Sequence, residues 1–372
     1  MTDAYLALNA GSSSMKFGLS EASDPAEILL SGSAERLGSD AATLAIRDAY
    51  GKQVQGSLGA AGHGEALTEL CAAISRLRPE LRITGVGHRI VHGGTHFNDP
   101  LPVTPEVLHA LRELIPLAPL HQPHGILGIE TAQAQFPEAT HVACFDTAFH
   151  AGKPWVHESF ALPRQYFDEG VRRYGFHGLA CASICDALER GGYPLADRKI
   201  AIAHLGNGCS VTAVAGGRSV ATSMGFTALD GLTMGTRCGR IDPGVLLHLM
   251  KNGSDADEIE RVLYHQSGLL GLSGMSNDMR DLATSDAPEA AQAIAYFIER
   301  VIEEIARMAA AMRGLDCVVF SGGIGENAAD LRDRITAGLS FLRRSDGSAL
   351  EICVEPANEE RQILVTLHRL AR

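Results

Sequence analysis

Two glycine- and asparagine-containing turns, far apart in the chain, constrain the fold more than any other feature of the sequence. Tyr5–Leu8 is an apolar strand candidate, Asn9–Ser14 has the small polar residues of a turn, and Met15–Leu19 alternates like a return strand. The same order returns later as a strand over Lys199–Leu205, a turn over Gly206–Gly208 and a return strand over Ser210–Ala215. Two such hairpins predict two related α/β halves, each offering a phosphate-binding turn to one central cleft.

The first turn is not a P-loop, although Lys16 follows it. A P-loop has Gly directly before the lysine and a hydroxyl directly after it, whereas Met15 precedes Lys16 and Phe17 follows. The turn still suits phosphate, because successive backbone amides, the hydroxyls of Ser12–Ser14 and the Lys16 ammonium can donate toward one point, and Asn9 can orient a metal-bound water. Alone the signal is weak, since most Ser-rich hairpin turns are only turns.

A third turn, Ser321–Asn327, follows a predicted strand over Cys317–Phe320 and precedes a predicted helix. Its Gly-Gly-Ile-Gly run allows close backbone approach, and the start of the next helix offers amide groups to a nucleotide. Two hairpins and a glycine-rich turn together resemble the layout of the actin, hexokinase and Hsp70 ATPase superfamily.

The remaining pattern alternates between helices and strands. Helices are predicted over Gly64–Arg78, Pro105–Leu114 and Gly125–Gln135, and strands over Ile83–Val91 and Ala139–Phe145. The stretch after the last strand contains Pro154 and Pro163 and reads as a passage between domains. The apolar segment Ala290–Leu315 carries five charged residues between 299 and 307, so it cannot span a membrane. Its apolar residues recur at three- and four-residue intervals, which predicts an amphipathic soluble helix.

Charge and cysteine usage narrow the classes of partner. The 372 residues carry a formal net charge of −12, which argues against nucleic acid or an anionic membrane as the main partner. No signal peptide is expected from the amino terminus. The eight cysteines contain no C-x-x-C pair and favour free thiols in a reducing cytosol. His88, His92 and His96 have helical metal-ligand spacing, but the neighbouring glycines disfavour a helix and therefore a metal cluster.

Nine sequence blocks, in order, resemble the acetate kinase family, a group of short-chain acyl kinases. They are Asn9–Ser14 with Lys16, Gly87–Gly94, Phe145–His150, Arg173–Gly178, His204–Gly208, Ser223–Thr227, Met234–Arg237, Ser276–Arg280 and Gly323–Asn327, and a tenth, Asn358–Glu360, follows near the carboxyl end. The resemblance implies duplicated actin-like, ribonuclease H-like α/β domains around a central cleft. It places the amino-terminal domain at residues 1–148 plus 360–372 and the carboxyl-terminal domain at 149–359.

The resemblance also implies the reaction and its setting. The family transfers the γ-phosphoryl group of ATP reversibly to acetate, giving acetyl phosphate and ADP, with Mg²⁺ or in its place Mn²⁺. Propionate or another short-chain carboxylate is the alternative substrate. A cytoplasmic homodimer is expected, which links acyl-CoA metabolism to ATP through the acyl phosphate, with no nucleic acid or membrane partner.

Site residues carry over from the matching blocks. The expected catalytic residues are Arg89, Asp146, His177 and Arg237, and the expected magnesium positions are Asn9 and Glu359. Nucleotide contacts are expected from Ser12, Lys16, His204, Leu205, Gly206, Asn207, Gly208, Asp278, Met279, Arg280, Gly323, Ile324, Gly325, Glu326 and Asn327. The acyl pocket is expected from Arg89, Val91, Leu120, Phe176 and Ala228.

The role of Asp146 has two readings. The family assigns the position to acid/base catalysis. A carboxylic acid with a pKa of roughly 4 to 5 is already ionised at neutral pH, so it needs no base to become a nucleophile. Asp146 would then orient an arginine or the hydrated Mg²⁺.

Several positions depart from the family pattern and leave rivals to consider. Arg240 stands where an acidic or amide residue is usual, Ala228 replaces a usual Pro, His124 lies in a normally Pro-rich turn, and the stretch 328–356 is short.

One rival function is that of a sugar kinase or phosphatase of the same superfamily, in which Asp146 would be the base. The other is a nucleotide-gated binding module, although the chain lacks an added peptide-binding region.

Overall fold

The chain forms two compact units in the computed structural model, which describes residues 1–11 and 13–371. Unit 1 comprises Met1–Phe149, Gly178–Ser183 and Asn358–Arg372, and unit 2 comprises His150–His177 and Ile184–Ala357. Ser12, expected in the phosphate turn, lies outside the described residues. Across the described ranges no helix combines the length and apolarity needed to cross a membrane.

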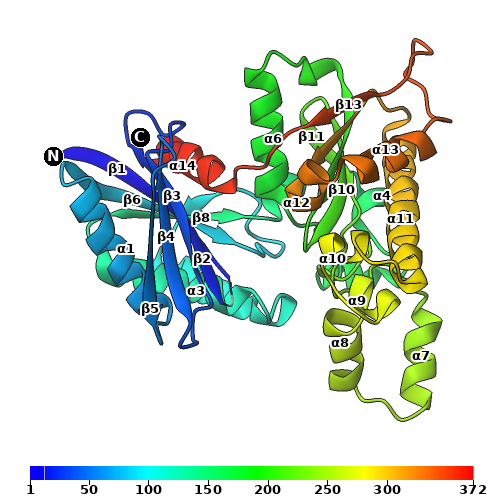
Figure 1. The fold of residues 1–372 in the computed structure, drawn as a ribbon, viewed down its shortest axis with the longest axis horizontal. Coiled ribbons are helices and arrows are strands. Elements are labelled where there is room, and N and C mark those ends of the chain that lie inside the picture. Colours follow the sequence, from blue (N-terminus) through cyan, green and yellow to red (C-terminus); the bar gives the residue numbers. More distant parts are fainter. Residues whose placement is uncertain (12, 372) are drawn as a thin grey trace. The chain divides into compact units, whose positions relative to one another are not determined.

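Unit 1 is built on an eight-stranded mixed sheet with the order β5-β4-β3-β2-β1-β6-β8-β7 (Figure 1). Its strands are β1 (Thr2–Ala10), β2 (Ser14–Glu21), β3 (Leu30–Glu35), β4 (Ala42–Asp48), β5 (Gln53–Gly59), β6 (Leu81–Ile90), β7 (Leu101–Pro102) and β8 (Thr140–Phe145). β1 to β5 form an antiparallel meander, whereas β6 pairs in parallel with both β1 and β8. The carboxyl ends of β1, β6 and β8 therefore lie at the same edge of the sheet.

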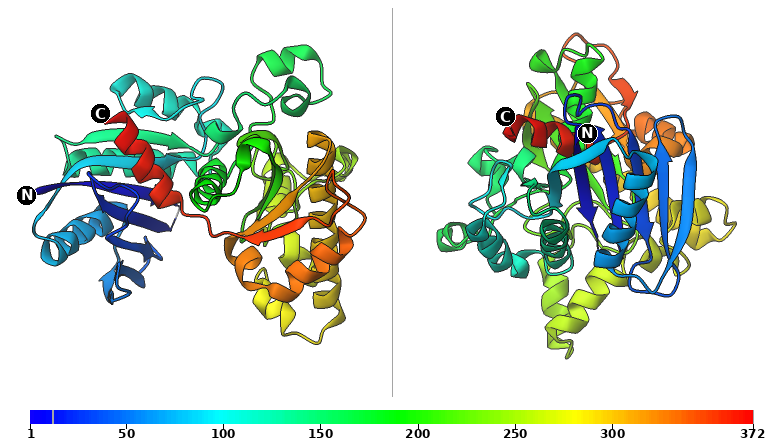
Figure 2. Two further views of the ribbon diagram at one scale, coloured as in Figure 1. Left: turned by 90° about the horizontal axis from the view of Figure 1, so that it is seen from above. Right: turned by 90° about the vertical axis from the view of Figure 1, so that its left-hand side faces the viewer.

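Helices cover both faces of this sheet. They are α1 (His63–Leu77), α2 (Pro105–Glu113), η1 (Ile115–Leu117), α3 (Gln122–Gln135) and α14 (Glu359–Leu370). The alternation of β1 explains the two layers: Leu6 and Leu8 join a core that includes Leu67 of α1, whereas Tyr5 and Ala7 pack with residues of α14. In Figure 2 the red α14 accordingly crosses the strands on the face opposite α1.

Unit 2 repeats the central part of this topology. Its five strands are β9 (Lys199–Leu205), β10 (Cys209–Ala215), β11 (Arg218–Thr222), β12 (Cys317–Ser321) and β13 (Glu351–Val354), in the order β11-β10-β9-β12-β13. β9 to β11 are antiparallel, and β9, β12 and β13 are parallel. The order β3-β2-β1-β6-β8 in unit 1 has the same directions, so the duplication expected from the two hairpins is confirmed.

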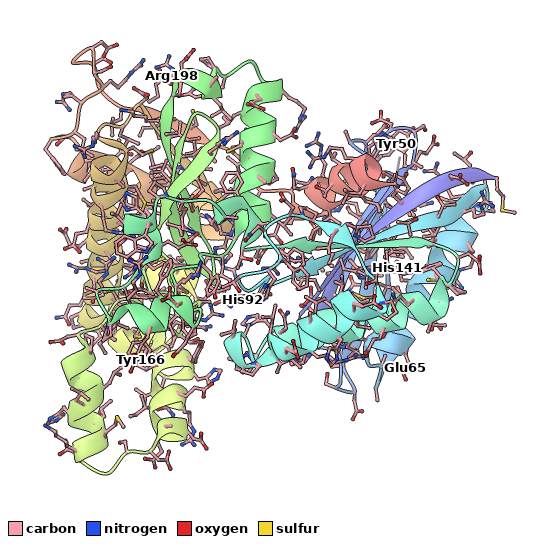
Figure 3. All side chains as sticks on the ribbon, turned by 180° about the vertical axis from the view of Figure 1, so that it is seen from behind. Tyr50, Glu65, His92, His141, Tyr166 and Arg198 are labelled. Carbon is pink, nitrogen blue, oxygen red and sulfur yellow. The ribbon has the colours of Figure 1, made fainter. Side chains whose placement is uncertain are left out.

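The helices of unit 2 surround this sheet. They are η2 (Ala148–His150) and α6 (Gly178–Arg190), which both begin in unit 1, α4 (Trp155–Glu158), α5 (Arg164–Asp168), η3 (Leu195–Asp197), α7 (Pro243–Lys251), α8 (Ala256–His265), α9 (Gly268–Ser273), α10 (Met279–Ala283), α11 (Pro288–Met312), α12 (Gly322–Asn327) and α13 (Ala329–Gly338). α11 covers the predicted amphipathic segment up to Met312, and Phe297, Val301 and Ile305 of its apolar stripe are fully buried. Figure 3, the view from behind, shows how densely side chains fill the layers.

Two features differ from the sequence analysis. The strands β3, β4 and β5 were not foreseen, because β5 is largely exposed and its glycine and serine content hides the alternation. The expected glycine-rich loop over Ser321–Asn327 is wrong as a loop, since Gly322–Asn327 already forms α12 directly after β12. Gly322 makes this sharp entry feasible with a φ of +77°, in the left-handed region.

We expect Gly32 of β3 to be essential for the antiparallel meander. A Cβ at this position would lie 1.9 Å from the Ala45 carbonyl oxygen, whereas a Cβ at Gly56 of β5 would meet nothing within 4 Å. Gly32→Ala should lower the free energy of unfolding by about 1 to 3 kcal/mol or more, the scale of overpacking. Gly56→Ala, the matched control in the same sheet, should change it by less than about 0.5 kcal/mol. Urea unfolding followed by circular dichroism measures both, and equal stabilities would contradict the expectation.

Candidate active site

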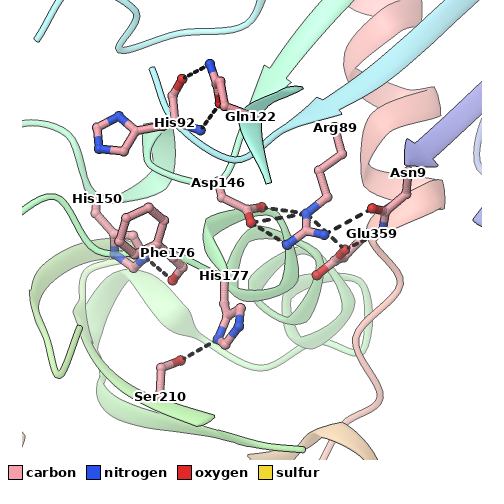
Figure 4. Close-up of polar contacts among 10 residues, drawn as sticks. All are labelled: Asn9, Arg89, His92, Gln122, Asp146, His150, Phe176, His177, Ser210 and Glu359. Carbon is pink, nitrogen blue, oxygen red and sulfur yellow. Dashed lines mark hydrogen bonds and ion pairs between the residues drawn. The ribbon is translucent and has the colours of Figure 1, made fainter. Parts of the chain in front are cut away.

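Parallel strand pairing brings four predicted residues of unit 1 together. Asn9 lies near the end of β1, Arg89 near the end of β6, and Asp146 directly after β8. Arg89 pairs in register with Cys144, so the end of β8 delivers Asp146 beside it. Glu359 joins them from the first turn of α14 (Figure 4). The carboxyl ends of parallel strands are where α/β sheets place their ligand sites.

Arg89 is the centre of this group. Its Nη2 lies 2.5 Å from Asp146 Oδ2, and its Nε donates to both Asp146 oxygens at 3.2 and 3.1 Å. Its Nη1 donates to Asn9 Oδ1 at 3.0 Å, and Glu359 Oε2 lies 3.6 Å from Nε. Asn9 Nδ2 in turn donates to the same Glu359 oxygen at 3.1 Å. The guanidinium is thus fixed by a carboxylate fork on one side and by an amide on the other.

Asp146 is held at its main chain as well as at its carboxylate. Its amide donates to the Ile90 carbonyl and its carbonyl accepts from the Gly178 amide, each at 2.9 Å. A Cβ at Gly178 would lie 2.1 Å from the Asp146 carbonyl oxygen, so this approach requires glycine. The side chain is fully buried, and both of its oxygens contact Arg89. A carboxylate in this state is a rigid part of the arginine site.

The group holds more carboxylates than its cations neutralise. Burial raises the pKa of Asp146, Arg89 opposes that rise, and Glu359 adds to it. Burial and Glu359 also raise the pKa of Glu360, against the attraction of Lys16. The pKa of Arg89 is raised because the attraction of these carboxylates outweighs its burial. Three carboxylates face one half-buried arginine and an exposed lysine, and this excess of negative charge suits a bound cation.

The oxygens of Asn9 and Glu359 fit the chemistry of Mg²⁺. Mg²⁺ prefers oxygen ligands, keeps several waters and usually takes one or two carboxylates. Among the described residues, no group of three His, Cys, Asp or Glu side chains is arranged to hold a metal. A site of one carboxylate and one amide completed by water therefore fits these residues better than a closed protein cage does.

In unit 2, His177 lies over the second hairpin. Its Nδ1 is 3.0 Å from the Ser210 hydroxyl, and its ring centroid is 4.8 Å from that of His204. Ser210 and His204 face each other in the register of β10 and β9. A Cβ at Gly208 would lie 3.2 Å from His177 Nε2, so the glycine turn passes close under the ring. His177 itself has a left-handed backbone with a φ of 60°.

Arg237 is half-buried and forms no ion pair within the ranges 1–11 and 13–371. Its Nη1 contacts the Ala228 carbonyl at 3.4 Å and Met234 Sδ at 3.8 Å, and the guanidinium lies 5.9 Å from the Tyr264 ring centre. Burial lowers the pKa of Arg237, with Tyr264 opposing that effect. A partly desolvated guanidinium without a carboxylate partner is a binding position for an anion.

Three of the expected nucleotide segments converge in unit 2. A Cβ at Gly206 would approach the Gly323 amide at 3.7 Å, and one at Gly235 would meet Asn207 Oδ1 at 2.7 Å and the Asn277 carbonyl at 3.2 Å. The structure thus brings His204–Gly208 together with the starts of α12 and α10. Arg280 instead points to solvent, 89% exposed, and pairs with Asp278 at 2.6 Å.

The other expected residues are less closely assembled. Ala228 contacts Arg237, and Phe176 is buried beside His177 in the chain, whereas Leu120 is exposed and Val91 half-buried in unit 1. Glu326 Oε1 accepts from the Gly322 amide at 2.8 Å, so it caps its own helix. His88 and His92 do not share a site: His88 Nε2 contacts His141 Nδ1 at 3.0 Å, and the amide of His92 donates to the Gln122 side chain (Figures 3 and 4).

Sequence reasoning missed the supporting partners. Ser210 and Tyr264 belong to no recognised block, and their contacts with His177 and Arg237 arise only from packing. Met234 lies in the same block as Arg237, but its contact with the guanidinium was not expected. Glu360 belongs to a recognised block, yet its proximity to Asp146 and Lys16 followed from no spacing rule. The one usable signal for Ser210 was its place directly after the second hairpin turn.

The chain is similar to known proteins in both sequence and fold. The family described as the acetokinase family matches residues 4–357. An acetate kinase of Methylocella silvestris is 45% identical over 97% of this chain and 91% of its own length, and one of Deinococcus radiodurans is 47% identical over 91% and 86%. Among solved structures, Porphyromonas gingivalis acetate kinase superposes with a TM-score of 0.89 at 32% identity, covering 100% of both chains.

A propionate kinase of Francisella tularensis superposes comparably well, with a TM-score of 0.90 at 35% identity, covering 99% of this chain and 100% of that one. These similarities extend over both units, including every block on which the resemblance in sequence depended. The chain belongs to the acetokinase family.

Proposed function

We propose that the chain transfers the γ-phosphoryl group of ATP reversibly to acetate, giving acetyl phosphate and ADP by direct in-line transfer. The observation that carries this proposal is Arg237, a half-buried cation without a carboxylate partner among the described residues, in contact with Ala228. Membership of the family and the names of its relatives support acetate as the acceptor. Propionate is the second candidate, favoured by the Francisella tularensis neighbour.

The two arginines and His177 are proposed to stabilise the transferring phosphoryl group. Its loose transition state carries charge on the equatorial oxygens, so positioned cations and hydrogen-bond donors lower the barrier more than covalent help does. Arg237 offers donors not engaged by a carboxylate, and Arg89 is held rigidly by Asp146. His177 is held at Nδ1 by Ser210, which orients Nε2.

Asp146 is proposed to orient Arg89 and not to remove a proton. Arg89 engages both of its oxygens, and the acceptor carboxylate is ionised before it reacts. A general base must reach the proton that it abstracts, and here there is neither a proton to abstract nor an unengaged Asp146 oxygen. The rival readings as a sugar kinase or phosphatase need such a base and are therefore less well supported.

Mg²⁺, or Mn²⁺ in its place, is proposed to bind at Asn9 and Glu359. When bound it would neutralise charge on the phosphoryl oxygens. Lys16 and the turns at Gly206–Gly208 and Gly323–Asn327 are proposed to hold the nucleotide, together with Ser12 and Asp278–Arg280. The carboxylate excess around Arg89 supports the metal, and the convergence of the glycine turns supports the nucleotide.

A cytoplasmic homodimer is proposed from the family. Unit 2 supports it with exposed apolar side chains on and near the paired helices α7 and α8 and the adjoining α9, which Figure 1 shows at one end of this unit. These side chains are Val245, Leu247, Met250, Val262, Leu272 and Met275. Exposed apolar surface of this kind marks protein interfaces.

Replacing Arg237 or Arg89 by Ala should lower kcat by roughly 100-fold or more, the scale of losing a key electrostatic donor. Lys should restore only part of the activity, since it lacks the planar fork. Hydroxylamine trapping of the acyl phosphate measures the rates. Arg82→Ala is the control, because Arg82 lies on β6 like Arg89 but pairs with Asp3 on the surface. Turnover near normal in both active-site variants would remove these arginines from the site.

Asp146→Asn should lower kcat, but the loss should not show the pH dependence expected when a general base is removed. Because the acceptor is already ionised, raising the pH from about 6 to about 9, above carboxylate pKa values, should not restore the rate. The variant should instead need more Mg²⁺, since Arg89 loses the charged partner that orients it beside Asn9 and Glu359. Recovery in proportion to hydroxide would contradict the orienting role.

Ala228 should leave room for one more methylene on the acceptor. We expect kcat/KM for propionate to lie within about tenfold of that for acetate. One methylene in an apolar pocket changes specificity by about 10- to 200-fold, and the expected difference lies at the small end of this range. Ala228→Pro should widen the preference for acetate and leave the KM for ATP unchanged, because the Ala228 carbonyl that contacts Arg237 is retained. If the unmodified enzyme rejects propionate by about 100-fold or more, another side chain closes the pocket.

A further inference from the structure

The segment from Tyr174 to His177 has a backbone that cannot hold its shape alone. Gly175 and His177 both have left-handed conformations, with φ of 83° and 60°. For a residue with a Cβ such as His177, this conformation is unfavourable and persists only where the surroundings enforce it. The segment carries two proposed site residues, Phe176 and His177, so the groups that enforce its shape bear on the reaction.

His150 holds the segment at Phe176. It is fully buried, its Nε2 lies 2.9 Å from the Phe176 carbonyl oxygen, and its Nδ1 lies 2.9 Å from the Ser219 hydroxyl. A carbonyl only accepts, so Nε2 carries the proton and Nδ1 accepts from Ser219. Burial lowers the pKa of His150 to about 3, which keeps the ring neutral with this one tautomer. Figure 4 shows the ring aimed at Phe176.

Lys153 holds the same segment at Tyr174. Its Nζ donates to the Tyr174 carbonyl at 2.9 Å and to the His150 carbonyl at 2.6 Å, with only 6% of the residue exposed. A buried lysine on two carbonyls is costly, and burial lowers the pKa of Lys153 to about 8. A position that only filled the apolar core would not require a buried lysine that donates to two carbonyl groups.

The remaining contacts close the segment from the other side. The Tyr174 and Gly175 amides donate to the Gly225 carbonyl at 2.9 and 3.3 Å. A Cβ at Gly175 would lie 2.4 Å from Thr222 Cγ2 and 3.0 Å from the His150 ring. The main chain that leads into His177 is therefore clamped between His150 and β11.

We propose that His150, oriented by Ser219, and Lys153 are positioning residues that set the main chain of Tyr174–His177, and through it the acyl-side Phe176 and the phosphoryl-side His177. This inference rests on the proposed roles of Phe176 and His177. Neither His150 nor Lys153 touches a substrate in this scheme. Both act through carbonyl groups whose positions fix where the next side chain points.

The test compares two amides at position 150 that carry no charge and differ in reach. Gln places its amide nitrogen near the site of His Nε2 and keeps the donor to Phe176, whereas Asn ends near the site of Nδ1 and loses it. In His150→Asn we expect kcat/KM for acetate to fall by about 10- to 100-fold, the scale of a small misplacement of reacting groups. The KM for ATP should stay unchanged. His150→Gln should recover most of the lost activity.

Thermal unfolding of both variants is measured in parallel. If His150 were purely structural, its replacement would lower the stability without selectively lowering kcat/KM for acetate while the KM for ATP stays unchanged. Equal kcat/KM for acetate in the Gln and Asn variants would overturn the proposal. Should His150→Asn not fold, Ser219→Ala and Lys153→Met replace it: a lower kcat/KM for acetate with unchanged KM for ATP supports the proposal, and wild-type kinetics in both overturns it. His177→Ala serves as the reference, because full activity there would refute the proposed role of His177 itself.

Discussion

The ion pair between Arg89 and Asp146 is the contact around which unit 1 arranges its polar residues. It exists because β6 and β8 run in parallel and in register, so that one strand ends in the arginine and its neighbour ends just before the aspartate. Burial makes the pair sensitive to its surroundings, since removing one partner would leave an uncompensated charge. Asn9 and Glu359 complete the set from β1 and α14, and the arginine is thereby held in one orientation.

Unit 2 holds its proposed site segments in place with glycines and main-chain contacts. Gly208 lets the hairpin turn pass under His177, Gly235 lets a loop approach Asn207, and Gly322 turns β12 directly into α12. A Cβ would clash at Gly235 and Gly322 and would be tight against the His177 ring at Gly208, so each glycine allows a close approach between two segments. The result is a set of amides and one arginine without a carboxylate partner among the described residues, a surface suited to phosphate oxygens.

In the proposed reaction, the buried acid and the cationic or hydrogen-bonding side chains have different roles. A carboxylate acceptor needs no deprotonation, so the most buried acid, Asp146, is available to orient a cation. Charge stabilisation then depends on how rigidly Arg89, Arg237 and His177 are held. In this scheme Ser210, His150 and Lys153 are proposed to act indirectly, because each holds a side chain or main-chain segment in place.

The sequence by itself determined the duplicated fold and the family, and it predicts Asn9, Arg89, Asp146, His177 and Arg237 as site residues. Hairpin turns and ordered sequence blocks are local patterns, so they can be recognised from the sequence alone. The sequence did not reveal β3 to β5, of which the largely exposed β5 lacks a clear alternation, or the helix that begins at Gly322. Only the tertiary structure decided that Asp146 is fully engaged by Arg89, that Arg237 lacks a carboxylate among the described residues, and that His150 aims at the Phe176 carbonyl, because hydrogen-bond partners distant in sequence are chosen by packing and not by spacing along the chain.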